Sequence, residues 1–233
     1  MRGLRSGFKY PGPPPDSGPS VRIVVFGAGG ALGTCITAEL VRRDHTVKVV
    51  VRAGKKPGSA RPRTAIVIAD VTDPRSVAEA VRGADAVVSA VGPAEGQEAS
   101  VLLNAARGLL EGLRKAGVRR LVVVGGAGSL EVSPGVQLAD TAQFPPAWKP
   151  VADAHGAALA IYREEPDLEW TVVSPAALIT PGVRTGHYRA GGDQLLVDAK
   201  GESRISAEDY AVAIADEIET PRHIRRRFTV AAA

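Results

Sequence analysis

The sequence has 233 residues, 45% of them apolar and 4% aromatic, and carries a formal net charge of +4. It contains no apolar run of the roughly 18 residues that a membrane span needs, no basic patch large enough for nucleic acid, and one cysteine, which excludes an internal disulfide. We therefore expect a cytoplasmic protein that binds neither membranes nor nucleic acids. The histidines and the cysteine show no metal-ligand spacing.

The chain divides into a short extension and one long domain. Residues 1–20 are rich in glycine and proline and include the run Pro-Gly-Pro-Pro-Pro at 11–15. Proline disrupts helices and central strands, so we expect a disordered extension. Residues 21–233 show no internal repeat and no sign of a second domain, which predicts a single domain.

The first structured stretch of the chain is an apolar run over residues 21–26, which predicts a strand. Glycines follow it, and apolar residues at helical spacing predict a helix over 30–43. Strand, glycine turn and helix together are the context of a dinucleotide-binding site, where the backbone and the helix N-terminus meet a pyrophosphate. The residues expected to contact the dinucleotide here are Gly27, Ala28, Gly30, Ala31, Leu32 and Gly33.

A second strand is predicted over residues 46–51 and ends at Arg52. In dinucleotide-binding folds the end of this strand meets the adenosine ribose, where an acid binds the 2′-hydroxyl and an arginine accommodates a 2′-phosphate. Arg52 therefore favours NADP(H) over NAD(H). The alternative is that Arg52 is only a surface charge at the end of a strand.

A third strand, predicted over residues 64–69, is followed by Asp70 and Val71. A carboxylate such as Asp70 can accept a hydrogen bond from the adenine amino group, so we expect both residues to contact the cofactor. Alternatively, Asp70 serves a turn or caps the helix that begins at Pro74. Asp73 fits the capping role better.

A fourth strand is predicted over residues 85–90. It ends in Ala90, Val91 and Gly92, which are small enough for a nicotinamide ribose to lie against the backbone. A helix over 98–116 and a fifth strand over 120–124 follow, and that strand also ends in glycines.

The last part of the chain alternates two long irregular segments with regular elements. We expect substrate loops at 125–150 and 175–203, a helix over 151–164, a sixth strand over 169–174, a helix over 206–219 and a last strand over 227–231. The alternation predicts an α/β fold: a Rossmann-type, doubly wound, mostly parallel sheet of about seven strands with helices on both faces. Ligands of such folds bind at the carboxyl ends of the strands.

Several motifs together resemble those of a known superfamily. They are Gly-x-x-Gly-x-x-Gly at 27, 30 and 33, Arg52, Asp70-Val71, Ala90-Val-Gly92 and Trp170-Thr-Val-Val-Ser-Pro-Ala176. The chain from residue 21 onward is similar to atypical short-chain dehydrogenases/reductases, in the NAD(P)H-binding group of NmrA-like proteins, biliverdin-IXβ and flavin reductases, and proteins assigned as NAD-dependent epimerases. The resemblance implies NADP(H) binding, to which Gly126, Pro175 and Ala176 would also contribute.

The chain departs from the wider superfamily in its catalytic residues. That superfamily uses Tyr-x-x-x-Lys on the helix before the sixth strand, but none of the four tyrosines here has lysine four residues later. The superfamily's serine near the end of the fifth strand is replaced by Gly125 or Gly126, with Ser129 the nearest substitute. His155, on one helix face with Leu159 and Tyr162, is the best candidate proton donor. A packing role is the alternative for His155, and a loop-capping role for Ser129.

Three functions remain open at this point. The favoured one is an NADP(H)-dependent reductase that transfers hydride to a small organic acceptor such as a flavin, a quinone or a carbonyl compound. The alternatives are a cofactor-retaining epimerase or isomerase and a non-catalytic redox sensor of the NmrA-like kind. We expect a small-molecule substrate and a monomer or homodimer.

Overall fold

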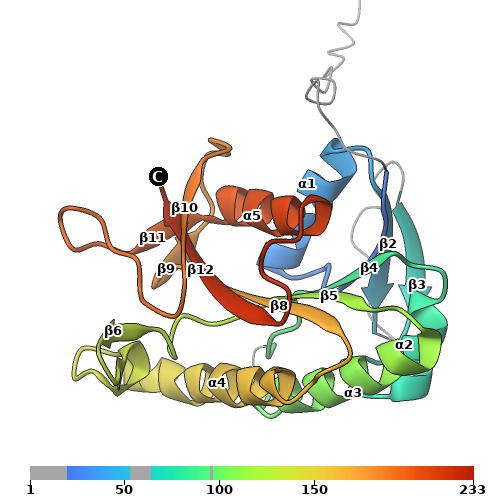
Figure 1. Cartoon of the computed structure of the whole chain (residues 1–233), viewed down its shortest axis with the longest axis horizontal. Coiled ribbons are helices and arrows are strands. Elements are labelled where there is room, and N and C mark those ends of the chain that lie inside the picture. Colours follow the sequence, from blue (N-terminus) through green and yellow to red (C-terminus); the bar gives the residue numbers. More distant parts are fainter. Residues whose placement is uncertain (1–19, 53–63, 95–96) are drawn as a thin grey trace, which may run out of the picture.

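The computed structural model describes residues 20–52, 64–94 and 97–233. Its centre is an eight-stranded sheet in the order β10-β12-β8-β5-β4-β1-β2-β3 (Figure 1). Its neighbouring strands pair in parallel except β10 and β12. In chain order these strands are β1 (Arg22–Phe26), β2 (Thr46–Val51), β3 (Thr64–Ile68), β4 (Ala86–Ser89), β5 (Arg120–Val124), β8 (Glu169–Ser174), β10 (Tyr188–Gly191) and β12 (Arg226–Ala232).

Helices cover both faces of the sheet (Figure 1). α1 (Ala31–Arg42) and α5 (Ala207–Glu219) lie on one face, and α2 (Pro74–Val81), α3 (Val101–Ala116) and α4 (Lys149–Arg163) lie on the other. Alternate residues of β1 enter different cores, with Ile23 and Val25 facing α1 and α5 and Val24 and Phe26 facing the other three helices. The doubly wound fold predicted from the alternating pattern is confirmed.

The ends of the helices follow from local chemistry. The Asp73 carboxylate accepts a hydrogen bond from the Arg75 N–H and caps α2, and the Ser206 hydroxyl does the same for the Asp209 N–H of α5. Gly117, at φ +70°, ends α3 in the left-handed conformation that glycine adopts without strain. Asp73 rather than Asp70 is therefore the α2 cap.

The prediction that residues 125–150 and 175–203 are irregular was wrong in part. The first segment contains β6 (Glu131–Ser133), β7 (Val136–Gln137) and two short 3-10 helices, Leu138–Asp140 and Pro146–Trp148; the second contains β9 (Leu178–Thr180) and β10. β9 pairs with β11 (Arg204–Ser206), and β10 extends the main sheet. These strands are short, and tertiary pairing rather than local propensity forms them.

Two further expectations concern the N-terminal extension and membrane spans. The predicted extension lies outside the described residues, apart from Ser20. None of the helices in the described ranges is both long and apolar enough to cross a membrane.

Candidate functional site

The glycine turn after β1 packs too tightly for any other residue at two positions. A β-carbon at Gly27 would lie 2.3 Å from the Ala90 carbonyl oxygen, and Gly27 has φ +76°. A β-carbon at Gly33 would lie 2.1 Å from the Gly27 carbonyl oxygen. These contacts bring the start of α1 against the ends of both β1 and β4.

The N-terminus of α1 has no side-chain cap. Gly30 occupies the N-cap without a side-chain hydrogen bond, and the first turn contains no acidic residue. A β-carbon at Gly29 or at Gly92 would meet no atom within 4 Å. Free N–H groups at the positive end of a helix dipole, beside open backbone, suit an anionic group. The turn therefore fits the pyrophosphate of a dinucleotide.

Arg52 and Asp70 lie close together just beyond the carboxyl ends of β2 and β3. Arg52 is exposed, and its guanidinium Nη1 lies 3.5 Å from Gln97 Oε1. Two hydrogen bonds from Thr72, one from its N–H and one from its hydroxyl, lower the pKa of Asp70, and the charge of Arg52 lowers it further. Asp70 thus orders the turn after β3, as its alternative role predicted, while Arg52 remains available to an anionic ligand.

Val71 does not offer a side chain to a ligand. It is 7% exposed and belongs to the core under α2 and α3. A β-carbon at Gly108 of α3 would lie 2.2 Å from the Val71 carbonyl oxygen. The Val71 side chain therefore packs α3 against the sheet, and the predicted contact of this residue with a cofactor stays a prediction.

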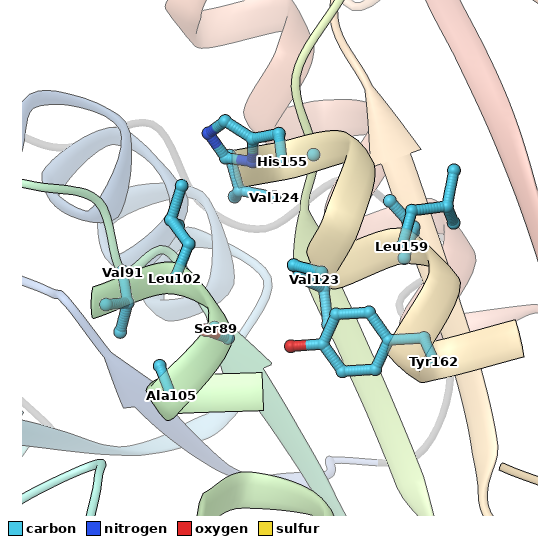
Figure 2. Close-up of a pocket in the computed structure, with 12 residues that line it drawn as sticks. Ser89, Val91, Leu102, Ala105, Val123, Val124, His155, Leu159 and Tyr162 are labelled. Carbon is cyan, nitrogen blue, oxygen red and sulfur yellow. The ribbon is translucent and has the colours of Figure 1, made fainter. Parts of the chain in front are cut away.

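A pocket opens at the carboxyl ends of β4 and β5, between α3 and α4 (Figure 2). Ser89 and Val91 line it and flank Ala90, the residue on which Gly27 packs. The glycine turn and the pocket therefore share the β4 turn as a wall. The remaining lining residues are Leu102, Ala105, Val123, Val124, Gly125, His155, Ala158, Leu159, Tyr162 and Val172.

His155 is the imidazole of α4 that lines this pocket (Figure 2). Its ring lies over Gly126, where a β-carbon would be 2.9 Å from the imidazole Cγ. Burial lowers the pKa of His155 to about 4, so the imidazole is neutral at pH 7. Among the described residues it has no hydrogen-bond partner, which leaves both ring nitrogens for a ligand or solvent.

Ser129, the other predicted catalytic residue, is engaged elsewhere. Its hydroxyl accepts a hydrogen bond of 2.8 Å from Arg227 Nη1 of β12, and its carbonyl accepts another from the same nitrogen. Arg227 also binds Asp193, so it ties together the two long segments that follow β5 and β8. Ser129 is absent from the pocket lining, and the structure gives it an anchoring role.

Three further residues that were predicted to bind the cofactor lie just beyond the carboxyl ends of the strands. Pro175 and Ala176, directly after β8, are buried, and Gly126 is half-buried beneath His155. Sequence reasoning assigned no function to Ser89 or Tyr162, which also line the pocket. A signal for Tyr162 existed in its spacing, because a residue seven positions after His155 returns to the same helix face.

Fold and site together define a Rossmann protein whose carboxyl edge is built for a dinucleotide. A sequence model of a family described as NAD(P)H-binding matches residues 27–221. The chain belongs to this NAD(P)H-binding family, and a nicotinamide dinucleotide is its class of cofactor. The resemblance to atypical short-chain dehydrogenases/reductases is confirmed.

Relatives cover nearly the whole chain. The uncharacterized protein YwnB of Bacillus subtilis (strain 168) is 41% identical over 213 residues, which is 90% of this chain and 98% of YwnB. A crystal structure from Burkholderia pseudomallei, of a protein provisionally named as exported, is 50% identical with a TM-score of 0.83 and covers 91% of this chain and 99% of its own. One from Streptococcus pneumoniae, provisionally named an NADH-flavin reductase, is 32% identical with a TM-score of 0.82 and covers 92% and 100%.

Proposed function

We propose that this protein is an NADP(H)-dependent reductase that transfers hydride to a small organic acceptor. The observation that carries the proposal is the shared wall between the glycine turn and the pocket. Gly27 packs on Ala90, and the neighbours of Ala90 line the pocket that contains His155. A dinucleotide with its pyrophosphate at the glycine turn can therefore extend along this wall toward His155.

The chain's own residues would hold the cofactor at two further points. Arg52 is exposed beside Asp70 and can pair with a 2′-phosphate, which favours NADP(H). Gly92 leaves backbone uncovered on the path toward the pocket, and Gly126 lies against the His155 ring at the end of that path. When bound, the nicotinamide supplies a hydride.

The pocket itself, about 20 Å³, has room for water but not for an organic ring, so the acceptor would lie at its mouth. The composition of the pocket favours an acceptor with an apolar, planar body there. Its walls are mostly Val, Leu and Ala side chains, and the described lining includes no charged group at pH 7. Reduction of a carbonyl or quinone consumes a proton together with the hydride, and His155 is the side chain placed to deliver that proton to the acceptor oxygen. A flavin-like acceptor also agrees with the name of the Streptococcus relative.

The test is a panel of flavins, quinones and carbonyl compounds offered to the protein with NADPH, with oxidation followed by absorbance. We expect oxidation with at least one planar acceptor, and His155→Ala to lower turnover about 100-fold with little change in NADPH affinity. NADPH binding without turnover on any acceptor would favour a redox sensor. Interconversion of a substrate without net NADPH loss would favour an epimerase, the provisional name of a Bacteroides thetaiotaomicron relative that is 39% identical.

A further inference from the structure

The pocket continues past His155 toward two buried hydroxyl groups (Figure 2). Ser89, the last residue of β4, and Tyr162, two turns beyond His155 on α4, both line it, and each is 3% exposed. The Tyr162 hydroxyl points into the cavity rather than away from it (Figure 2). Three polar groups from two elements therefore surround one small space whose other walls are apolar.

The two hydroxyls have no hydrogen-bond partner among the described residues. The other buried tyrosine, Tyr210, differs in this respect, since its hydroxyl donates to the Val173 carbonyl at 2.6 Å. Buried hydroxyls in proteins are nearly always bonded to protein or to ordered water. The cavity measures about 20 Å³, and a polar space of this kind with several partners is where a protein holds ordered water.

If His155 is to donate a proton from one ring nitrogen, a second proton donor must stand beside its other ring nitrogen. A neutral imidazole is a very weak acid, because loss of its single N–H proton would leave an anion. Donation from one ring nitrogen becomes feasible when the other nitrogen gains a proton in the same step. Of the residues that line the pocket only His155 and Tyr162 titrate, and burial raises the pKa of Tyr162. Tyr162 therefore stays protonated and can hold water without becoming the proton source.

We propose that Tyr162 and Ser89 hold ordered water behind His155, and that this water returns a proton to the imidazole while His155 donates its own to the acceptor oxygen. In this step one N–H bond of His155 breaks and one O–H bond forms on the acceptor. A second N–H bond forms on His155 as one O–H bond of the water breaks, and a proton from solvent re-forms that O–H bond, so that no hydroxide is left and His155 ends neutral. Tyr162 is then a positioning residue. The proton return rests on the proposed reductase function, whereas the water site does not.

The first test uses the ligand-free protein. We compare the wild type with Tyr162→Phe, and with Tyr188→Phe as the matched control, because the Tyr188 hydroxyl binds Asp216 on the opposite face of the sheet. High-resolution crystal structures of the wild type and the control should show water bonded to the Tyr162 hydroxyl, and Tyr162→Phe should lose it. The ¹⁵N resonances of His155 should report a changed tautomer ratio or pKa in Tyr162→Phe alone.

The second test uses NADPH turnover with the acceptor found in the panel. Tyr162→Phe should lower kcat about tenfold or more and change the solvent deuterium isotope effect, with the affinity for NADPH unchanged. Ser89→Ala, a smaller change, should act in the same direction and serves if Tyr162→Phe does not fold. A dry cavity in the wild type, or His155 resonances that are the same in all variants, would overturn the water site. Unchanged kcat and isotope effect in both variants would overturn the proton return, and a wild type without turnover would overturn the proposed function and the proton return together.

Discussion

The amino ends and the carboxyl ends of the central strands, here called the amino edge and the carboxyl edge, differ in how completely their polar groups are paired. At the amino ends of the strands nearly every charge is paired: Arg22 with Asp85, Arg119 with Glu169, and Arg120 with Glu217. At the carboxyl ends the turns after β1, β4 and β5 consist mostly of glycine and other small residues. The side chains of His155, Ser89 and Tyr162 there have no hydrogen-bond partner among the described residues. The first edge pairs its charges within the fold, and the second has polar groups that the proposed function assigns to ligands.

The amino edge contains a buried network of paired charges, in which Arg120 Nε has no hydrogen-bond partner among the described residues. Glu217 is 3% exposed and binds Arg120 at 2.9 Å, while its second oxygen lies 2.7 Å from His223 Nδ1. Arg120 donates further hydrogen bonds to Thr171 and to the carbonyl oxygens of Glu169 and Glu217. This cluster joins β5, β8 and the end of α5, and it contributes no atom to the pocket.

The largest effect that should separate the two edges is a loss of stability from Glu217→Ala. This change leaves the Arg120 charge buried without its partner, so the free energy of unfolding should fall by about 3–5 kcal/mol, measured by urea denaturation. The NADPH affinity of the folded fraction should stay the same. Glu111→Ala, which removes the exposed partner of Lys115, should cost less than about 1 kcal/mol. A weakened NADPH affinity in Glu217→Ala would show that the edges are not independent.

The free energy of unfolding of the protein should fall in acid, because His155 at the carboxyl edge is held neutral in the folded state. Its pKa is about 4 in the folded protein against about 6.5 when unfolded, so the unfolded chain binds the proton more readily below pH 6.5. Stability is fully present above pH 6.5 and is lost as the pH falls toward 4, by about 3 kcal/mol. His155→Leu cannot titrate, so its stability relative to the wild type should rise by that amount between pH 6.5 and 4. A constant difference across this range would contradict a buried neutral imidazole.

Gly27→Ala should damage the carboxyl edge specifically. The new β-carbon would collide with the Ala90 carbonyl oxygen at 2.3 Å, so NADPH affinity should fall at least about 100-fold, or roughly 2.7 kcal/mol, by calorimetry. Gly117→Ala is the matched control, because Gly117 has φ +70° but no atom within 4 Å of an added β-carbon. It should cost about 1–2 kcal/mol of stability and no affinity. Equal affinity losses would remove the glycine turn as the pyrophosphate site.

The smallest predicted effect concerns the choice of dinucleotide. Arg52→Asp should weaken NADPH binding about tenfold or more, or about 1.4 kcal/mol, and NADH binding much less, because only NADPH carries the 2′-phosphate. Arg107→Asp, an exposed change of equal charge on α3, controls for general attraction of anions. An equal loss for both dinucleotides would remove Arg52 as the phosphate selector.

Much of the fold could be predicted from the sequence because local patterns determine it. The boundaries of β5, β8 and α5 follow from apolar runs and from the cap at Ser206, and the glycine turn follows from spacing. The edge strand β10 could not be predicted, because its pairing with β12 depends on tertiary contact. The hydrogen bond that holds Ser129 could not be predicted either, since its partner Arg227 lies 98 residues away in the chain.

The pocket itself also required the structure. Tyr162 shares a helix face with His155 in any helical interpretation, but its hydroxyl joins Ser89 only because β4 and α4 meet at one end of the sheet. Likewise the buried role of Val71 depends on the approach of Gly108 from α3. Spacing along the sequence predicts which residues share a face of one helix or strand, whereas the proposed site is formed where several elements meet.

A crystal structure with NADPH tests the central claim most directly. We predict the pyrophosphate at the N-terminus of α1 beside Gly30, the 2′-phosphate beside Arg52, and the nicotinamide against Gly126 and His155. A dinucleotide bound away from the glycine turn, or one whose nicotinamide lies far from His155, would contradict the division of this protein into a structural edge and a ligand-binding edge.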